Sequence, residues 1–368
     1  MKKNPTKNTE MRLLVIRTSA MGDVALTTPV LKGMREQYPD VELELLTRAA
    51  FKPFFSSVNG LELFIPDLKK RHKGFPGLIR LFKDINRHSE IDYIIDLHDV
   101  LRSKILRFFF RLTGVHAAVI DKGRSEKKSL ITGKKKVQLK HSVERYRDVF
   151  ARAGFPVKLT EGPWIIPSAE AVTKASLMMA SQNGLNIGVA PYAKHKLKVW
   201  PEENMVRLLG QISENHKCRF WLFGGQEDSE RLTALQSKIA GSTNLAGKLD
   251  LNEELAFMSK LDLMIAMDSS NMHMAALVGT KVISIWGGTD PLSGFSAWMQ
   301  PDNFSIRIPV EELTCRPCTT YGKGECKRGD FACMNWLTPE KVFERIEKLV
   351  LQDMPPVPLK RDFPLKGD

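Results

Sequence analysis

The sequence predicts an α/β protein made of two halves, each a doubly wound parallel sheet. Short apolar runs of strand length alternate with helical patterns, which is typical of a parallel sheet with helices on both faces. This alternation restarts past the middle of the chain, and a length of 368 residues suits two domains better than one core. Because ligands bind at the carboxyl ends of parallel strands, we expect the two halves to face each other across a cleft.

The first half begins with an apolar run rich in β-forming residues, followed by a turn of small residues and a helix with apolar positions Val24, Leu31 and Met34. The expected regular elements are strands at 12–17, 41–46 and 91–97, and helices at 77–86 and 100–112. The ten residues before the first strand are polar and lack the apolar core of a secretory signal. We therefore expect a disordered lead-in and a cytoplasmic protein.

The second half repeats the alternation. The expected elements are strands at 185–190, 218–223, 261–266 and 281–286, helices at 201–215 and 274–278, and a last helix capped by Thr338 with Pro339 at its first position. Three prolines and the lack of a helical period mark 154–168 as the connection between the halves. We therefore predict Rossmann-like domains at 1–165 and 166–345, and a helix end with an irregular tail at 346–368.

The charge of the chain favours anionic partners. Its formal net charge is +13, and residues 61–150 alone hold 21 lysines and arginines against 11 aspartates and glutamates. Such a field attracts nucleic acid, anionic lipid or a phosphorylated substrate, while a well-solvated basic surface is the alternative. The absence of aromatic clusters among the basic residues, and of a standard binding motif, argues against nucleic acid. No apolar run is long enough to predict a membrane span.

The turn after the first strand contains Ser19, Gly22 and Asp23, at the edge of the sheet where ligands bind. Gly22 permits close approach of the backbone, and Asp23 falls in the first turn of the following helix. A carboxylate aimed into a cleft can take the proton from an attacking hydroxyl, whereas a plain helix N-cap at Asp23 is the structural alternative. The turn does not match the GxGxxG pattern of a dinucleotide site.

Two segments of the second half have the composition of phosphate sites. The loop with Lys194, Lys196 and Lys198 lies between a strand and a helix, and either binds a diphosphate or is a solvated basic loop. The second segment follows the strand at 261–266 and gathers an acid, hydroxyls, an amide and an imidazole at a helix start, where backbone N–H groups favour anions. Its polar residues are Asp268, Ser269, Ser270, Asn271 and His273, and a flexible loop with Thr289 lies at the same edge.

Four of the five cysteines lie within nineteen residues of one another: Cys315, Cys318, Cys326 and Cys333. In a cytoplasmic protein such clustering favours a structural zinc over disulfides. The spacing is irregular, so reduced or partly oxidised thiols are the alternative.

Four segments, in this order, resemble the motifs of glycosyltransferase family 9, which contains the lipopolysaccharide heptosyltransferases. They are Ser-Ala-Met-Gly-Asp-Val with Thr-Thr-Pro within 11–29, Lys-Val-Trp-Pro at 198–201, Asp-Ser-Ser-Asn-Met-His-Met-Ala-Ala at 268–276, and Gly-Gly-Thr-Asp-Pro at 287–291. The resemblance covers about 11–350. It implies a GT-B fold with an acceptor domain followed by a donor domain, and inverting transfer from a nucleotide sugar, usually ADP-heptose, with no metal in the chemistry.

The resemblance also implies roles for single residues. Asp23 falls where the family places its general base, and Lys198 falls on the lysine that binds the donor diphosphate and stabilises its departing charge. The turn with Gly224, Gln226 and Glu227 would face the adenosine. The other residues expected near the donor are Ser19, Gly22, Lys194, Asp268, Ser269, Ser270, Asn271, His273 and Thr289.

The basic first domain suits an anionic glycolipid acceptor at the cytoplasmic face of the inner membrane. The candidate acceptor residues are Arg71, Lys73, His98 and Arg102. The helix at 100–112 carries basic residues on one side and apolar residues elsewhere; it either lies at a membrane interface or packs on the core with a basic outer face. Two other functions on the same fold stay open: another nucleotide-sugar enzyme, such as an epimerase, and a non-catalytic nucleotide-sugar binder.

Overall fold

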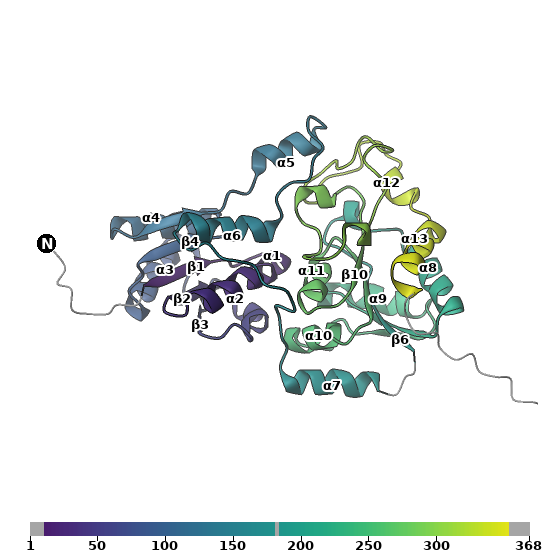
Figure 1. Ribbon diagram of the computed structural model, residues 1–368, viewed down its shortest axis with the longest axis horizontal. Coiled ribbons are helices and arrows are strands. Elements are labelled where there is room, and N and C mark those ends of the chain that lie inside the picture. The colour runs from purple at the N-terminus through teal and green to yellow at the C-terminus, as the bar shows by residue number, and fades with distance from the viewer. Residues whose placement is uncertain (1–10, 181–183, 353–368) are drawn as a thin grey trace, which may run out of the picture.

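The computed structural model describes residues 11–180 and 184–352, and the expected lead-in at 1–10 and most of the expected tail lie outside these residues. Two sheets lie side by side, each with helices on both faces (Figure 1). Every pair of neighbouring strands in both sheets is parallel. The predicted α/β architecture with two parallel sheets is therefore confirmed.

The first sheet has the strand order β3-β2-β1-β4-β5. Its strands are β1 (Arg12–Ile16), β2 (Glu42–Leu46), β3 (Leu61–Phe64), β4 (Tyr93–Asp96) and β5 (His116–Val119). The helices of this half are α1 (Met21–Ala25), α2 (Thr28–Gln37), the 3-10 helix η1 (Ala49–Phe55), α3 (Gly74–His88), α4 (Leu101–Leu112), α5 (Arg124–Ile131) and α6 (Ser142–Arg152). β1 is central because its apolar run is buried on both faces.

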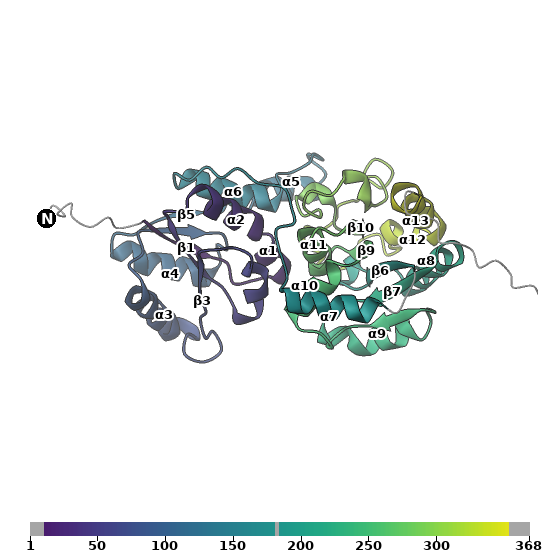
Figure 2. The same ribbon diagram turned by 60° about the horizontal axis from the view of Figure 1, so that its bottom comes forward.

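Helices α3 and α4 cover one face of the first sheet, and α2 and α6 cover the other (Figure 2). The alternation of side chains along β1 divides the core accordingly, since neighbouring residues of a strand point to opposite faces. Leu14 and Ile16 pack with the apolar residues of α3 and α4, whereas Leu13 and Val15 pack with those of α2 and α6.

The second sheet has the strand order β11-β10-β9-β6-β7-β8. Its strands are β6 (Leu185–Ala190), β7 (Cys218–Leu222), β8 (Ser242–Asn244), β9 (Leu263–Met267), β10 (Val282–Ile285) and β11 (Ser305–Ile306). Its helices are α7 (Ala169–Met179), α8 (Glu202–Asn215), α9 (Ser229–Gln236), α10 (Leu251–Met258), α11 (Ser270–Leu277), α12 (Ala332–Asn335) and α13 (Pro339–Ile346). Short 3-10 turns lie at Lys196–Lys198, Gln226–Asp228, Pro291–Ser293 and Asp302–Phe304, and a π-helical turn lies at Glu347–Leu351.

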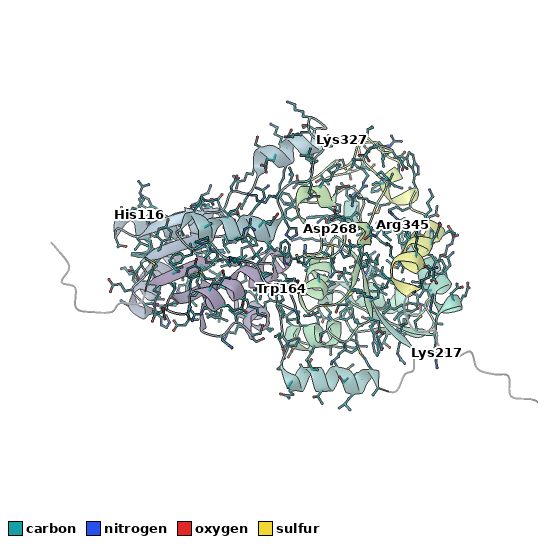
Figure 3. The ribbon with its side chains drawn as sticks, viewed as in Figure 1. His116, Trp164, Lys217, Asp268, Lys327 and Arg345 are labelled. Atoms are coloured by element: carbon teal, nitrogen blue, oxygen red, sulfur yellow. The ribbon has the colours of Figure 1, made fainter. Side chains whose placement is uncertain are left out.

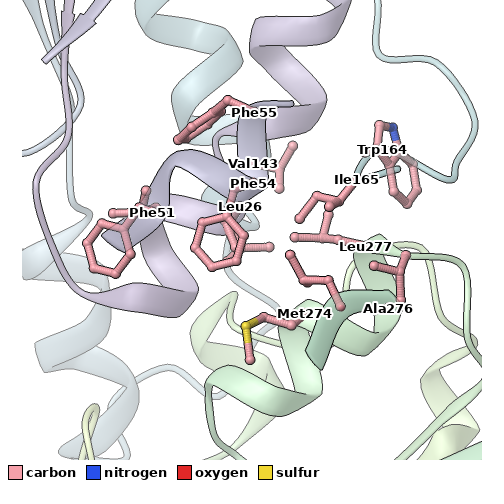
Figure 4. Packing of buried hydrophobic residues seen from close by; sticks show 14 of the residues in the cluster. Leu26, Phe51, Phe54, Phe55, Val143, Trp164, Ile165, Met274, Ala276 and Leu277 are labelled. Atoms are coloured by element: carbon pink, nitrogen blue, oxygen red, sulfur yellow. The ribbon is translucent and has the colours of Figure 1, made fainter. Parts of the chain in front are cut away.

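The two halves share a continuous apolar core. Figure 4 shows Leu26 and Phe54 of the first half facing Met274 and Leu277 of α11, with Trp164 of the connection beside them. The amide of Trp164 donates to the carbonyl of Leu277 at 2.9 Å. The predicted irregular connection at 154–168 therefore packs directly on α11, where its apolar residues help to join the halves.

Several expected elements differ in extent from those observed. The single helix expected over Val24, Leu31 and Met34 is two helices, because α1 ends at Ala25 and α2 begins at Thr28, with Pro29 in its first turn. The strand expected at 261–266 begins at Leu263, since the amide of Leu261 still belongs to the turn that ends α10. The helix expected from 274 begins at Ser270. The expected cap of α13, with the Thr338 hydroxyl accepting from a backbone amide, is confirmed.

Candidate active site

Asp23 lies in the first turn of α1, at the carboxyl edge of the first sheet. Its Oδ2 atom pairs with Nη2 of Arg17 at 2.8 Å and accepts a hydrogen bond from the amide of Ala20 at 3.4 Å. A third of the Asp23 side chain is exposed, whereas Arg17 is almost fully buried. Asp23 is not the N-cap residue of α1, which is Ala20, but its carboxylate lies at the third helical position and caps the helix start by accepting from the Ala20 amide. The carboxylate is thus fixed in position and still reachable by a substrate.

Arg17 is a site residue that the sequence analysis missed. Its Nη1 atom donates to the carbonyl of Leu97 at 2.5 Å, and its guanidinium lies 5.6 Å from the ring centroid of Tyr146. The Tyr146 hydroxyl in turn donates to the carbonyl of Asp23 at 3.3 Å. The available signal was a charged residue at the end of an otherwise apolar strand. Such a residue is rarely buried without a partner.

His98 lies opposite the turn that carries Asp23. Its Nε2 is 3.1 Å from the Ser19 hydroxyl, and its Nδ1 is 3.3 Å from the Thr18 hydroxyl. Burial, with the nearby positive charges of Arg17 and Lys122, lowers the pKa of His98 to about 3. The imidazole is therefore neutral near pH 7, with one nitrogen able to donate and the other to accept.

The four candidate acceptor residues lie in two places. His98 and Arg102 lie at the end of β4 and in the first turn of α4, and burial together with the charge of Arg48 lowers the pKa of Arg102. Arg71 and Lys73 precede α3 and are exposed. The guanidinium of Arg71 already forms two hydrogen bonds to the carboxylate of Asp84, at 2.7 and 2.8 Å. The structure therefore brings His98 to Ser19, with the charge of Arg102 near His98, and leaves Arg71 engaged with α3.

Lys198 and the segment after β9 meet in the second half. Nζ of Lys198 lies 2.8 Å from Oδ2 of Asp268, and the Thr289 hydroxyl donates to the same oxygen at 2.8 Å. Asp268 lies near the junction of the two halves (Figure 3). Its side chain is 7% exposed and that of Lys198 is 16% exposed. Three of the expected donor residues therefore form one cluster, although they come from three separate segments.

The start of α11 contains two buried polar atoms, Oγ of Ser269 and Nδ1 of His273, that have no hydrogen-bond partner among the described residues. Burial lowers the pKa of His273, although the nearby carboxylates of Asp268 and Asp23 oppose this effect. Buried polar atoms normally have partners. These two atoms lie at a helix start, where the free backbone N–H groups also favour an anion.

Gly22 brings the two halves of the site into contact. A Cβ atom on Gly22 would lie 2.9 Å from Cδ2 of His273 and 3.4 Å from Cα of Ser270. The turn that carries Asp23 therefore touches the helix start that carries Ser269 and His273. The lack of a side chain at position 22 permits this approach.

Substituting Gly22 tests this contact. Gly22→Ala should lower kcat by about tenfold, because α1 and α11 must move apart by a few tenths of an ångström and the reacting groups are then misaligned. The matched control is Gly210→Ala, since Gly210 lies in α8 with no atom near the added Cβ, so alanine there favours the helix. Initial rates and melting temperatures of both variants check this; equal kcat values in the two variants would contradict it.

The remaining expected donor residues lie at the carboxyl edge of the second sheet. Gly224 follows β7, and Gln226 and Glu227 are exposed in the 3-10 turn at Gln226–Asp228. A Cβ atom on Gly247 would meet the amide group of Gln226, so this turn lies against the loop after β8. Lys194 is exposed in the loop before Lys198. Their roles toward a nucleotide stay predictions.

Arg316 is a second residue that the sequence analysis missed. It is 1% exposed, and it donates to the carbonyls of Gly287 at 2.7 Å and Thr289 at 3.0 Å. Its Nη2 lies 3.2 Å from Oδ2 of Asp290, which is fully buried. Arg316 therefore supports the loop that presents Thr289 to Asp268. The only signal for it was its place inside the cysteine-rich stretch.

Removal of this guanidinium should destabilise the protein. Arg316→Met should lower the free energy of unfolding by about 3–5 kcal/mol, because it leaves the buried Asp290 carboxylate without its closest cation. Arg328→Met is the control, since Arg328 pairs with Asp330 at the surface, where solvent screening leaves such a pair little effect on stability. Urea unfolding of both variants measures the difference, and similar losses in the two would contradict the support assigned to Arg316.

The four clustered cysteines line one cavity of about 260 Å³, together with Arg316 and Lys136. All of them are free thiols, and Cys333 is buried. Within residues 11–180 and 184–352, no three His, Cys, Asp or Glu side chains are close enough together to hold a metal ion. The structure therefore offers no ligand set for the zinc site that was one of the two alternatives.

The chain matches a known protein family and several known proteins. A family model described as glycosyltransferase family 9 (heptosyltransferase) matches residues 78–324. The chain is 26% identical over 295 residues to the lipopolysaccharide core heptosyltransferase OpsX of Haemophilus influenzae, covering 76% of this chain and 80% of that protein.

Two solved structures have the same fold. The glycosyltransferase family 9 protein of Veillonella parvula is 20% identical with a TM-score of 0.74, covering 95% of this chain and 100% of that one. The Escherichia coli heptosyltransferase WaaC, solved with ADP-2-deoxy-2-fluoro heptose, is 20% identical with a TM-score of 0.61, covering 92% and 99%. The expected GT-B fold is thereby confirmed. The family match spans well over half of the chain, so this protein belongs to glycosyltransferase family 9 and is a glycosyltransferase.

Proposed function

We propose that this glycosyltransferase transfers a heptose from an ADP-heptose-like donor to an anionic lipopolysaccharide-core acceptor, with inversion of the anomeric carbon. The observation that carries the proposal is the contact between the two halves at Gly22 and His273. This contact sets the turn that carries Asp23 against the start of α11, which begins two residues after Asp268, the partner of Lys198 and Thr289. The names of the relatives, and the ADP-sugar analogue bound to one structural neighbour, support this choice of sugar and nucleotide.

In the proposed reaction, Asp23 accepts the proton of the attacking acceptor hydroxyl. The acceptor oxygen bonds to the anomeric carbon as the bond from that carbon to the diphosphate oxygen breaks, and the nucleoside diphosphate leaves with the electron pair. Arg17 and the Ala20 amide both contact Oδ2 of Asp23, so we assign the proton to Oδ1. Attack from the first half, opposite a leaving group bound to the second half, inverts the anomeric centre.

The second half, within 166–345, is the proposed donor side. The ammonium of Lys198 and the N–H groups at the start of α11 meet the negative charge that grows on the diphosphate, which is where electrostatic stabilisation is most effective. Ser269 and His273 supply buried polar atoms beside it. Asp268 and Thr289 orient Lys198, and the turn with Gln226 and Glu227 is assigned to the nucleoside.

The first half, within 1–165, is the proposed acceptor side. His98 lies beside Ser19, close to Asp23, and Arg102, Arg48 and Lys122 add positive charge around it. A phosphorylated acceptor is attracted by such a field. The proposed place of action is the cytoplasmic face of the inner membrane, where a lipid-borne acceptor is exposed to a cytoplasmic enzyme.

Calorimetric titration with ADP, UDP, GDP and CMP, in separate runs on the full chain, tests the donor assignment. Preference for ADP would support the proposal, and transfer from ADP-heptose to lipid A precursors would then be measured directly. Preference for another nucleotide would contradict the ADP-heptose-like donor and would leave the assignment as a glycosyltransferase intact. Binding of none of the four would contradict the donor site itself.

A further inference from the structure

The outer side of α4 carries exposed apolar residues that the proposed chemistry does not use. Leu101 is 74% exposed, Phe108 is 58% exposed and Leu112 is 71% exposed. Their spacing of seven and four residues places them on one side of the helix. The opposite side packs on the sheet through Ser103, Leu106 and Phe110. The helix is therefore apolar on two sides, although only one of them is covered by the described residues.

An aromatic group extends this side of α4 toward α3. The ring of Phe109 lies 6.0 Å from Phe108 and 6.0 Å from Phe75, which is itself 58% exposed at the start of α3. Phe109 also contacts Phe82 of α3 at 5.8 Å, which anchors the group to the core. We call the side formed by Phe75, Leu101, Phe108 and Leu112 the α4 face. Contiguous exposed apolar groups of this kind mark interaction sites more often than single exposed residues do.

The charges beside the α4 face identify its partner. Residues 101–112 contain four basic residues and no acidic residue. Lys104 and Arg111 are exposed, and they lie three or four residues from Phe108, at the spacing of neighbours on a helix surface. A basic helix with exposed Phe and Leu side chains is typical of segments that lie in the interface of an anionic bilayer.

The position of the α4 face agrees with a lipid-borne substrate. Its first turn, with Leu101 and Arg102, adjoins the proposed acceptor residues, because His98 is only a few residues before α4. From there the helix runs along the outside of the first half, away from the second half (Figures 1 and 2). A bilayer in contact with this side would lie next to the mouth of the acceptor site.

We propose that the α4 face docks this protein on the surface of an anionic lipid bilayer, with Phe108 and Leu112 entering the interface and Lys104 and Arg111 contacting lipid phosphates. This proposal rests on the proposed function, because the lipid-borne acceptor is what gives the protein a reason to dock. No helix among the described residues is long and apolar enough to cross a membrane, so the contact assigned here is with the surface. A second copy of the chain is the competing occupant of the α4 face.

The experiment is co-sedimentation of the full chain with vesicles at physiological salt, with neither donor nor acceptor present. One set of vesicles contains phosphatidylethanolamine with roughly one third phosphatidylglycerol, and the other contains phosphatidylcholine alone. The test variants are Phe108→Ser/Leu112→Ser and Arg111→Gln. The matched control is Leu177→Ser, because Leu177 on α7 is 71% exposed, as Leu112 is, but lies on the second half.

We expect the unmodified chain to bind the anionic vesicles at least about tenfold more strongly than the neutral ones. The double variant should lose at least about tenfold in binding, Arg111→Gln should lose several-fold, and Leu177→Ser should stay within about twofold. A higher salt concentration should weaken binding of the unmodified chain to the anionic vesicles, as for any charged contact. Transfer to a detergent-dispersed acceptor should be unchanged in the double variant.

Equal binding to both kinds of vesicle, or unchanged binding by the double variant, would overturn the docking proposal. A lipid-independent dimer that the double variant dissociates would overturn it in favour of a second copy. Because vesicle binding is measured without donor or acceptor, its failure leaves the transferase assignment intact. Conversely, vesicle binding by a chain with no transferase activity would contradict the proposed function and not the docking surface.

Discussion

Asp23→Ala is expected to lower kcat by about 10³-fold or more while donor affinity stays within a few-fold. A positioned general base contributes about 10²–10⁴-fold, and an alanine cannot take the proton of the acceptor hydroxyl. Donor affinity is spared because the proposed donor contacts come from the second half. Initial rates with saturating donor, together with calorimetric titration of ADP, measure the two quantities separately.

The ion pair with Arg17 complicates the alanine variant. Its removal leaves the Arg17 guanidinium buried with a weaker set of partners, and that alone destabilises the fold. Asp23→Asn is therefore the sharper test, because the amide oxygen can still accept from Arg17 while the group can no longer act as a base at neutral pH. A folded Asp23→Asn variant with near-normal kcat would refute the base assignment.

Lys198→Ala is expected to weaken ADP binding by about 10–100-fold, as a charge-assisted hydrogen bond contributes about 1.5–3 kcal/mol. The rate should also fall by about 10²-fold or more, because the lysine meets charge that grows in the transition state. Calorimetry and initial rates check both effects. Lys196→Ala is the matched control, since Lys196 lies in the same loop but its side chain is 62% exposed and pairs with Glu325 at the surface.

Asp268 makes the lysine experiment more informative. In Lys198→Ala the Asp268 carboxylate loses its ion pair, keeps the hydrogen bond from the Thr289 hydroxyl and would repel an incoming diphosphate. The double variant Lys198→Ala/Asp268→Asn removes this repulsion. If Lys198 binds the diphosphate directly, the ADP affinity of the double variant stays low. Recovery of near-normal ADP affinity in the double variant would instead show that Lys198 acts by neutralising Asp268.

The sequence by itself determined the fold class and pointed to the segments that form the candidate site. Buried parallel strands such as β1, β6 and β9 are continuous apolar runs, so each is visible within one short segment. In a parallel sheet the loop that follows a strand lies at the ligand-binding edge, which is why Asp23, Lys198 and Asp268 could be chosen from local pattern and family motif.

The strands that the sequence did not predict, β3, β5, β8 and β11, are partly exposed or very short. Their apolar signal is correspondingly weak.

The tertiary structure alone decided which of these residues meet. The convergence of Lys198 and Thr289 on Asp268, and the approach of Gly22 to His273, join segments whose spacing in the sequence carries no distance information. Arg17 and Asp23 lie in one segment, but only the folded turn between them shows that they form an ion pair. The same holds for Arg316, whose burial depends on the loop that it supports, and for the cysteines, which line one cavity without forming a metal-ligand set. Hydrophobic periodicity reports on one element at a time, whereas buried ion pairs and contacts between domains depend on how elements pack.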